Sequence, residues 1–292
     1  MESYNNNNNV QHKTKYEEII KNIPKEKLNN WTNIQETLKT KLINYDEHSW
    51  EINSQDPTKK LKSIGGMDIS CSKKNPSVAV AALVVVDNNL NIIYEKYEFA
   101  DITEPYVPGF LAFREISHYE KLINDIKKTD PDKIPEVLMI DGNGIYHQRG
   151  FGCACHIGVL TGIPTMGCSK TVLFVDGITK TKVRNISNKF INKGDYKELI
   201  GDSGKVWGAA IKSTDDSYVP MIISQGHKMS LKTSIELFKH TTKFRVPEPI
   251  RLADKISRRL IEEYENRGFK KFDIDDYLSK NKSKLLYNLT DN

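Results

Sequence analysis

Residues 78–99 read VAVAALVVVDNNLNIIYEKYEF, and this stretch decides the fold class. Its first nine residues, Val78–Val86, are all apolar, which is typical of a strand buried on both faces. After the turn-like Asp87-Asn88-Asn89, residues 92–99 alternate between apolar and polar side chains, as in a half-buried strand. The two segments are therefore predicted to form a hairpin. The apolar run is far shorter than the roughly 20 residues that cross a bilayer, so no membrane partner is expected.

Strands and helices alternate on both sides of this hairpin. The further strand candidates are Ser63–Ser70, Glu136–Ile140, Thr165–Cys168, Val206–Ile211 and Val219–Ser224. Helices are predicted over 111–128, 152–160, 231–239 and 250–264, and residues 15–44 carry a helix-length pattern with Trp31, Ile34, Leu38 and Leu42 on one face. Strands that come first and then alternate with helices predict an α/β fold, with a mixed sheet flanked by helices.

The chain has 292 residues, which fits one large α/β domain with tails as well as two domains. The Asn run at 5–9 cannot bury surface, so residues 1–12 are predicted to be a disordered tail. Residues 13–264 are predicted to form a single domain. Residues 265–292 are charged and weakly patterned, which predicts a mobile C-terminal tail.

The net charge of +5 excludes a strongly acidic protein and is compatible with a nucleic-acid partner. The N-terminus shows no apolar signal segment, which favours the cytoplasm, the nucleus or both, the nucleolus included. The four cysteines, expected to be reduced thiols, contain no CxxC pair. Cys153, Cys155 and His156 can in principle bind a metal, but we favour small buried residues near a helix start.

Two aspartates follow or interrupt apolar strands. Asp68 lies within Ile64-Gly-Gly-Met-Asp-Ile-Ser, where a carboxylate is costly to bury unless it is paired or bound to metal. Asp141 follows the apolar Val137–Ile140, at the carboxyl end of a strand, where α/β sheets place ligands. One such aspartate favours a turn or cap role, whereas two begin to favour a site.

Two further carboxylates lie on predicted helices. Glu115 ends Phe110-Leu-Ala-Phe-Arg-Glu, and its simplest interpretation is an exposed carboxylate paired with a nearby cation. Asp254 lies one turn into the last helix, where it can complement the helix dipole.

If these four carboxylates converge, they form an oxygen-ligand set of the kind that holds Mg²⁺ together with a substrate phosphate. Lys170 and His227 would then supply positive charge or proton transfer beside that phosphate. Without convergence, Lys170 is a solvated residue at a strand end and His227 a loop histidine. Spacing alone leaves both interpretations open.

Seven motifs in this order resemble the endonuclease V family over residues 30–263. They are Gly66-Met-Asp-Ile-Ser, Pro105–Glu115, Asp141–Gly152, His156-Ile-Gly-Val, Pro164–Lys170, Gly226-His227 and Pro247–Asp254. Bacterial members commonly have His-Pro-Arg where this chain has His147-Gln148-Arg149, and the run that follows is closer to eukaryotic members.

The resemblance implies a ribonuclease H-like fold and a hydrolase that depends on Mg²⁺ or Mn²⁺. It implies cleavage at the second phosphodiester bond on the 3′ side of inosine. Asp68, Glu115, Asp141 and Asp254 would be the metal-binding set, with Lys170 and His227 as catalytic residues.

The resemblance also implies a substrate-binding set. Pro105-Tyr106-Val107-Pro108 resembles the wedge that inserts beside the target base, although a rigid loop before a helix explains it equally well. Two prolines stiffen the loop, and Tyr106 offers a flat face. Gly142 and Gly144 would let the backbone approach a flipped base. His147 and Arg149 complete the set.

The sequence therefore predicts a monomeric endonuclease that cleaves inosine-containing single-stranded RNA and leaves 5′-phosphate and 3′-hydroxyl ends. The first alternative is a deoxyinosine-specific DNA repair enzyme with the same site. The second is a non-catalytic nucleic-acid-binding module, suggested by twelve Lys/Arg against six Asp/Glu in residues 227–271. Carboxylates at every motif argue against the second, because they repel the phosphate backbone.

Overall fold

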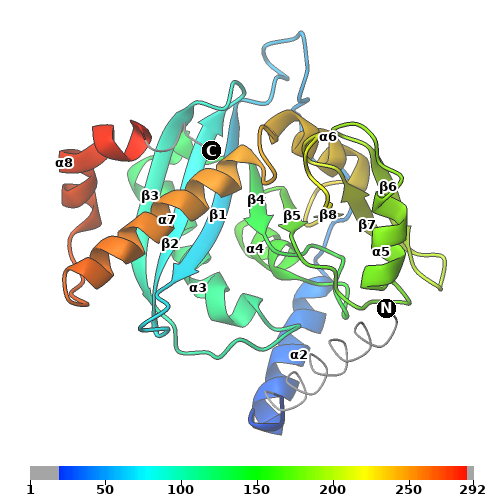
Figure 1. The fold of residues 1–292 in the computed structure, drawn as a ribbon, viewed down its shortest axis with the longest axis horizontal. Helices are drawn as coiled ribbons and strands as arrows, with labels where there is room; N and C mark the ends of the chain where they lie inside the picture. Colours follow the sequence, from blue (N-terminus) through cyan, green and yellow to red (C-terminus); the bar gives the residue numbers. More distant parts are fainter. Residues whose placement is uncertain (1–19, 288–292) are drawn as a thin grey trace.

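Figure 1 shows the computed structural model of the chain, which describes residues 20–287. Its centre is an eight-stranded sheet in the order β3-β2-β1-β4-β5-β8-β7-β6. The strands are β1 (Ser63–Cys71), β2 (Val78–Asp87), β3 (Ile92–Asp101), β4 (Val137–Asp141), β5 (Thr165–Ser169), β6 (Tyr196–Ile200), β7 (Val206–Ile211) and β8 (Met221–Gln225). β4 runs parallel to β1 and β5, and the other neighbours are antiparallel. The predicted mixed sheet is confirmed.

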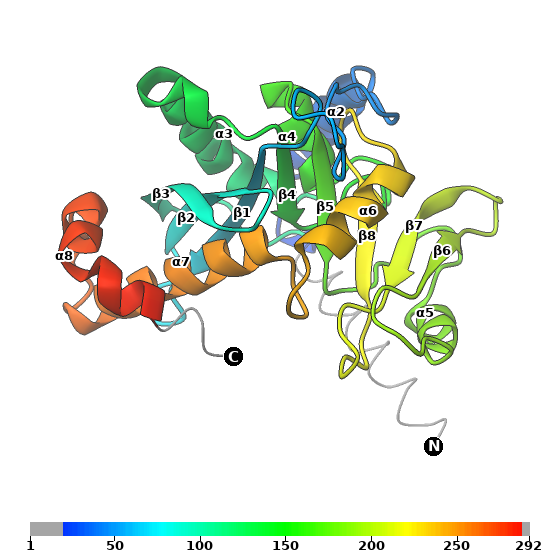
Figure 2. The same ribbon diagram turned by 90° about the horizontal axis from the view of Figure 1, so that it is seen from above.

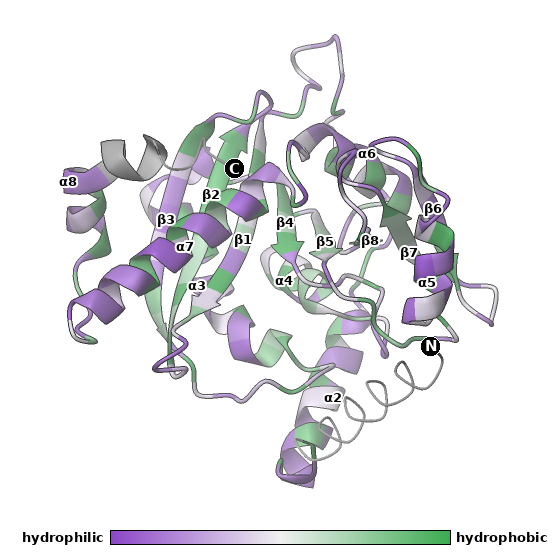
Figure 3. Cartoon of the chain, in the orientation of Figure 1, coloured by the Kyte–Doolittle hydropathy of each residue, from purple (hydrophilic) through white to green (hydrophobic). Residues whose placement is uncertain are grey.

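Helices cover both faces of this sheet (Figure 2). Those described are α2 (Lys25–Lys39), α3 (Ala112–Thr129), α4 (Cys153–Thr161), α5 (Lys180–Ser187), α6 (Leu231–Thr241), α7 (Glu248–Asn266) and α8 (Ile274–Tyr287), with a 3-10 turn η1 (Pro131–Lys133). α6 and α7 pack on one face, against the side chains of Ile64, Val80 and Val137. α3 and α4 pack on the other face, against Met67, Leu83 and Leu138. Figure 3 shows the resulting hydrophobic strands between more polar helices.

The predicted hairpin is present as β2 and β3, in which Val78 pairs with Asp101 and Val84 with Glu95. Every residue from Val78 to Val86 is buried, because β2 lies between β1 and β3 and is covered on both faces. No helix among residues 20–287 combines the length and apolar character of a membrane span.

Two elements lacked a sequence signal. β6 is an edge strand whose side chains are mostly exposed, so its residues show no buried alternation. α5 has eight residues with Val183 as its buried side chain, too few for a clear apolar face. The helix pattern at 15–44 also differs from the structure, because α2 ends at Lys39 and Leu42 lies in the loop beyond it.

The segment predicted to be a mobile tail contains helix α8, so the structure differs from that expectation. Phe272, Tyr277 and Leu278 pack against the core cluster, and Lys96 on β3 pairs with Asp275 at 2.8 Å. The segment is mostly charged, so its few apolar residues that pack on the core gave no clear helix pattern in the sequence. Residues 1–12, predicted to be disordered, lie outside the described part of the chain.

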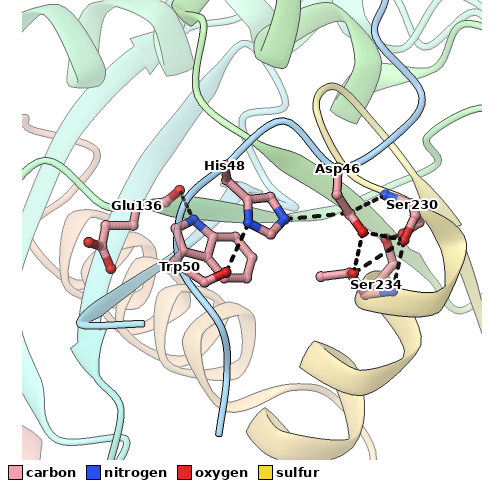
Figure 4. Close-up of polar contacts among 7 residues, drawn as sticks. Asp46, His48, Trp50, Glu136, Ser230 and Ser234 are labelled. Atoms are coloured by element: carbon pink, nitrogen blue, oxygen red, sulfur yellow. Dashed lines mark hydrogen bonds and ion pairs between the residues drawn. The ribbon is translucent and has the colours of Figure 1, made fainter. Parts of the chain in front are cut away.

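The loop after α2 fastens the start of α6 to the start of β4 (Figure 4). Asp46 accepts hydrogen bonds from the backbone and hydroxyl of Ser230, at 2.7 and 2.8 Å, and so holds the residue that caps α6. The ring of His48 stacks on Trp50, and the Trp50 indole donates to the backbone oxygen of Glu136 at 3.3 Å. This network lies at the amino-terminal edge of β4, opposite the edge where Asp141 ends the strand.

Candidate active site

Asp68 and Asp141 lie side by side because of the strand register. β1 and β4 are parallel with Met67 opposite Ile140, so the next pair along the two strands is Asp68 and Asp141. Side chains two residues apart share a face of a strand, and Gly66 and Asp68 therefore both face α7, as Met139 and Asp141 do. The register alone thus brings two carboxylates together at the carboxyl ends of β1 and β4.

A glycine brings the third carboxylate to this edge. A Cβ atom added at Gly66 would lie 2.1 Å from the carbonyl carbon of Pro249, so α7 crosses β1 more closely than any side chain at this position allows. Asp254 follows about one turn later on α7, and the hydroxyls of Ser70 and Ser257 meet at 2.7 Å beside it. The negative charge of Asp254 contributes to the raised pKa of Asp68.

Glu115 approaches from the other face of the sheet, in the first turn of α3. Burial raises its pKa to about 8, and the neighbouring charges of Asp68 and Asp141 add to the effect. Burial likewise raises the pKa of Asp68 to about 7, with Asp141 and Asp254 as further causes. The four predicted carboxylates therefore interact electrostatically. The protonated form is favoured at two of them, Asp68 and Glu115.

Two cations partly compensate for this acidic set, whose members are Asp68, Glu115, Asp141 and Asp254. Lys170 follows β5 and donates to Asp141 Oδ2 at 2.7 Å. Burial alone would lower the pKa of Lys170, but the Asp141 carboxylate raises it above the usual value. On α7, Arg258 donates to Asp254 Oδ1 at 2.7 Å. Sequence reasoning missed Arg258, although its i, i+4 spacing from Asp254 is the signal that finds such pairs.

The donor set fits a hard divalent cation. All four acidic side chains offer oxygen ligands, and burial together with the neighbouring carboxylates raises the pKa values of Asp68 and Glu115, so a bound cation would favour their charged forms. Within residues 20–287, no three His, Cys, Asp or Glu side chains are already arranged as a complete metal site. A bound cation would compete with Lys170 and Arg258 for Asp141 and Asp254.

The structure does not bring His227 to this set, contrary to the sequence prediction. β8 is antiparallel to β5, and its end pairs with the beginning of β5, where the Thr165 backbone donates to the His227 oxygen at 2.8 Å. The ring of His227 accepts a hydrogen bond from the Ile43 backbone at 3.3 Å. His227 is therefore a buried residue near the amino-terminal end of β5, at the opposite end of the central strands from Asp141.

The loop predicted to be a wedge presents its tyrosine to solvent. Tyr106 is 53% exposed between Pro105, which is exposed, and Pro108, which is partly buried. Val107 and Phe110 anchor the loop by packing against Trp31 on α2. The loop thus has an exposed aromatic tip and adjoins the helix that carries Glu115, and its role as a wedge stays a prediction.

The side chains of His147 and Arg149 point toward the backbone of the loop that carries Tyr106, and not toward solvent. Both donate to the carbonyl oxygen of Gly109, His147 through Nε2 at 3.0 Å, and Gln35 on α2 donates to the same oxygen at 3.2 Å. His147 Nδ1 accepts from the Arg149 backbone at 3.2 Å, which places the ring proton on Nε2. Burial lowers the pKa of His147 to about 4, so the ring stays neutral. These two residues position the wedge loop, and Gln35 joins them without having been predicted.

Comparisons with known proteins agree with this geometry. The Endonuclease V family model matches residues 46–255. Human Endonuclease V is 40% identical over 241 residues, which cover 82% of this chain and 84% of the relative. The chain belongs to the Endonuclease V family. Endonuclease V from Dictyoglomus turgidum is 35% identical over 236 residues, 79% of this chain and 92% of that protein, so the chain shares more with the human relative.

Solved Endonuclease V structures share the fold. The catalytic domain of human Endonuclease V superimposes with a TM-score of 0.79 at 37% identity and covers 85% of this chain and 100% of that one. Ciona intestinalis Endonuclease V, in complex with a 23mer DNA containing an inosine followed by a ribo-adenosine, has a TM-score of 0.75 at 32% identity and covers 82% of this chain and 99% of that one. The predicted ribonuclease H-like fold is confirmed.

Members of the Endonuclease V family hydrolyse phosphodiester bonds, and this chain is therefore an enzyme of that class. The hypothesis of a non-catalytic nucleic-acid-binding module is wrong.

The glycines after β4 have different roles in this Endonuclease V chain. A Cβ atom at Gly144 would lie 2.1 Å from the Gln225 carbonyl oxygen, and the Gly144 amide donates to the Ser224 hydroxyl at 2.9 Å. Gly144 thus lets the loop pack against β8 and is buried. Gly142 is partly exposed beside Asp141 and remains the better candidate for contact with a substrate.

The cysteines behave as expected for buried thiols. Cys153 and Cys155 are buried in the first turn of α4, and burial raises the pKa of both. The His156 ring packs on Phe113 and Phe151. These three residues are packing elements at the start of a helix, in agreement with the favoured interpretation.

Proposed function

We propose that this chain is a metal-dependent endonuclease that cleaves the second phosphodiester bond 3′ to inosine in single-stranded RNA. The observation that carries the proposal is the placement of Asp68 beside Asp141 at the ends of two parallel strands, with Glu115 and Asp254 coupled to them. The binding of inosine-containing DNA by Ciona intestinalis Endonuclease V supports inosine as the recognised base.

Mg²⁺ is the proposed cofactor, with Mn²⁺ able to substitute. Asp68, Asp141, Glu115 and Asp254 would hold it, because small hard cations take carboxylate oxygens and keep several waters. When bound, such an ion would lower the pKa of a water and neutralise charge on the leaving oxygen. In-line attack of a water on the phosphorus forms the new P–O bond while the 3′ oxygen leaves and takes up a proton, which gives 3′-hydroxyl and 5′-phosphate ends.

The chain's own residues contribute charge, order and orientation. Lys170 holds one oxygen of Asp141 and keeps an ammonium beside the position proposed for the reacting phosphate. Arg258 orients Asp254 along α7. His227 has no part in this mechanism, since it lies at the other edge of the sheet.

Recognition of the base rests on the wedge loop and the loop after β4. Tyr106, stiffened by Pro105 and Pro108, would occupy the stack left by an extruded inosine. The partly exposed backbone at Gly142 would contact that base. His147 and Arg149 would act indirectly, through Gly109.

A deoxyinosine-specific DNA repair enzyme is the second candidate, because the Ciona intestinalis complexes contain DNA. A protein separates RNA from DNA through the 2′-hydroxyl. Matched RNA and DNA strands with a single inosine, compared at one salt concentration with Mg²⁺ and with EDTA, decide between the two. Faster cleavage of the RNA strand supports our proposal, and faster cleavage of the DNA strand supports the repair enzyme.

The Asp141→Asn variant tests the site itself. It should lose cleavage by several orders of magnitude while it still binds the inosine strand in Ca²⁺, because the amide keeps the shape and removes the charge. Asp56→Asn, an exposed loop substitution, is the matched control. Cleavage by Asp141→Asn at the rate of the control would remove Asp141 from the site.

We further propose that the enzyme acts as a monomer in the cytoplasm, the nucleus or both, the nucleolus included. Size-exclusion chromatography with light scattering and imaging of a tagged full-length chain test these two proposals.

A further inference from the structure

Two lysines from distant parts of the chain meet at Gly150. A Cβ atom built at Gly150 would lie 3.7 Å from the ammonium of Lys39 and 3.8 Å from that of Lys205. Lys39 ends α2, and Lys205 immediately precedes β7. Because both distances start from the same Cβ position, the two ammoniums are separated by at most the sum of these distances. The oxygens of a single phosphate can bridge such a separation.

Both ammoniums are held in place by the fold. Lys39 donates to the backbone oxygen of Arg149 at 2.6 Å. Lys205 lies over the ring of Trp207, 3.8 Å from the ring centre, and the Trp207 indole is fixed by Asp176 at 2.8 Å. Groups that are already ordered lose little freedom when an anion binds, so the pair is preorganised.

The positive charge at this point is only partly compensated. Glu36 lies 3.6 Å from Lys39, but both side chains of this pair are largely exposed, and such pairs contribute little. In the described part of the chain, no carboxylate lies within ion-pair distance of Lys205, although Asp176 is near. Burial lowers the pKa of Lys205, and the positive charge of Lys39 lowers it further. An anion between the two ammoniums would offset that positive charge.

The position of the pair connects it to the candidate active site. Gly150 has a φ of +66° and belongs to the loop that leaves Asp141 at the end of β4. The adjacent Arg149 donates to Gly109 at the base of the wedge loop. In Figure 1, α2 lies beyond the ends of the central strands, on the side of this loop.

We propose that Lys39 and Lys205, whose ammoniums meet at Gly150, form a phosphate-binding subsite for the substrate strand, beside the wedge and separate from the carboxylates. The proposal rests on the function proposed above and extends it. Its ligand is a backbone phosphate next to the target nucleotide, so the contact carries no base specificity.

The salt dependence of strand binding tests the subsite. Labelled single-stranded RNA with one inosine, and the same strand with adenosine, are titrated in EDTA by fluorescence anisotropy from 50 to 300 mM KCl. For the double variant Lys39→Gln/Lys205→Gln, the slope of log Kd against log salt should fall by about 0.7, the value for one phosphate contact on a single strand. The loss should be equal for the two strands. The matched control is Lys59→Gln/Lys60→Gln, which removes two charges from an exposed loop.

A second pair of variants separates charge from folding. Gly150→Asp places a carboxylate between the ammoniums, whereas Gly150→Asn places a neutral group of the same shape there, and both residue types tolerate a positive φ. We expect Gly150→Asp to bind the RNA at least tenfold more weakly than Gly150→Asn. Equal affinities, or an unchanged slope in the double lysine variant, would overturn the subsite. If the salt slope falls in the double lysine variant as expected, but the wild-type protein shows no metal-dependent cleavage, the proposed function fails and the subsite stands.

Discussion

Replacement of Asp68 by Asn should stabilise the metal-free protein while it abolishes cleavage. In the folded chain the pKa of Asp68 is raised from 3.8 to about 7, mainly by burial and then by Asp141 and Asp254. The folded state therefore binds more protons than the unfolded state between these two pH values. By linkage, the contribution of Asp68 to stability falls as pH rises through this window and stays low above it.

The size of the effect follows from the same values. The difference between 3.8 and about 7 corresponds to about 4 kcal/mol at about 1.4 kcal/mol per pKa unit. This is an upper bound, because the site shares its charge among several carboxylates. Asn removes the charge with little change in shape, so at pH 8 the metal-free variant should unfold at a temperature about 5–10 °C above wild type. At pH 4 the two proteins should be nearly equal.

The assay is thermal unfolding in EDTA from pH 4 to pH 8, followed by the same series with excess Mg²⁺. Taking the difference between variant and wild type cancels other titrating groups, such as His147 and His156. With metal present, wild type should regain about 3 kcal/mol at a hundredfold excess over Kd, and the variant should gain much less. Asp56→Asn is the control, since Asp56 is exposed and its neighbours lower its pKa.

Two results would refute this reasoning. If the stability difference between wild type and Asp68→Asn does not change with pH, Asp68 is not held in a destabilised charged state. If Mg²⁺ stabilises both proteins equally, Asp68 does not contribute to the metal site.

Three further predictions concern the wedge and the misplaced histidine. Tyr106→Ala should lose more cleavage on duplex than on flexible single strands, with Tyr106→Phe close to wild type; equal losses on both substrates would argue against a wedge. Gln35→Leu removes one of three donors to the Gly109 oxygen and the acceptor that holds Arg149 Nε at 2.6 Å, and it should show the same duplex-selective loss with kcat on single strands changed less than threefold; a uniform loss on both substrates would contradict a positioning role. His227→Gln should retain kcat within a few-fold, because its ring contacts the Ile43 backbone, and a hundredfold drop would place it in the mechanism after all.

The central sheet was predicted well because its buried strands appear in the sequence as apolar runs. The nine apolar residues of Val78–Val86 require cover on both faces, and β2 has such cover. The same logic identified Asp68 and Asp141, since a carboxylate next to a buried strand needs a reason to be there. Their adjacency was not visible in the spacing, because it depends on the register between β1 and β4, which are far apart in the chain.

The failure at His227 has a definite physical cause. Lys170 and His227 both follow a buried strand and a short polar segment, so the local pattern treats them alike. β5 is parallel to β4, however, and β8 is antiparallel to β5, so the two strands end at opposite edges of the sheet. Strand direction is a property of the tertiary connections, and apolar periodicity contains no information about it.

His147 and Arg149 show a related limit that bears on how the wedge works. Polar residues in a glycine-rich loop after a catalytic strand suggest contact with substrate, yet these two converge with Gln35 on a single carbonyl oxygen, that of Gly109. Gly109 has a φ of +80°, a backbone conformation that favours glycine. Gln35 and Lys39 lie on α2, before the residues 46–255 that match the family model. Helix α2, outside the region matched by the family model, therefore contacts both the loop proposed to be a wedge, through Gln35, and the proposed phosphate subsite, through Lys39.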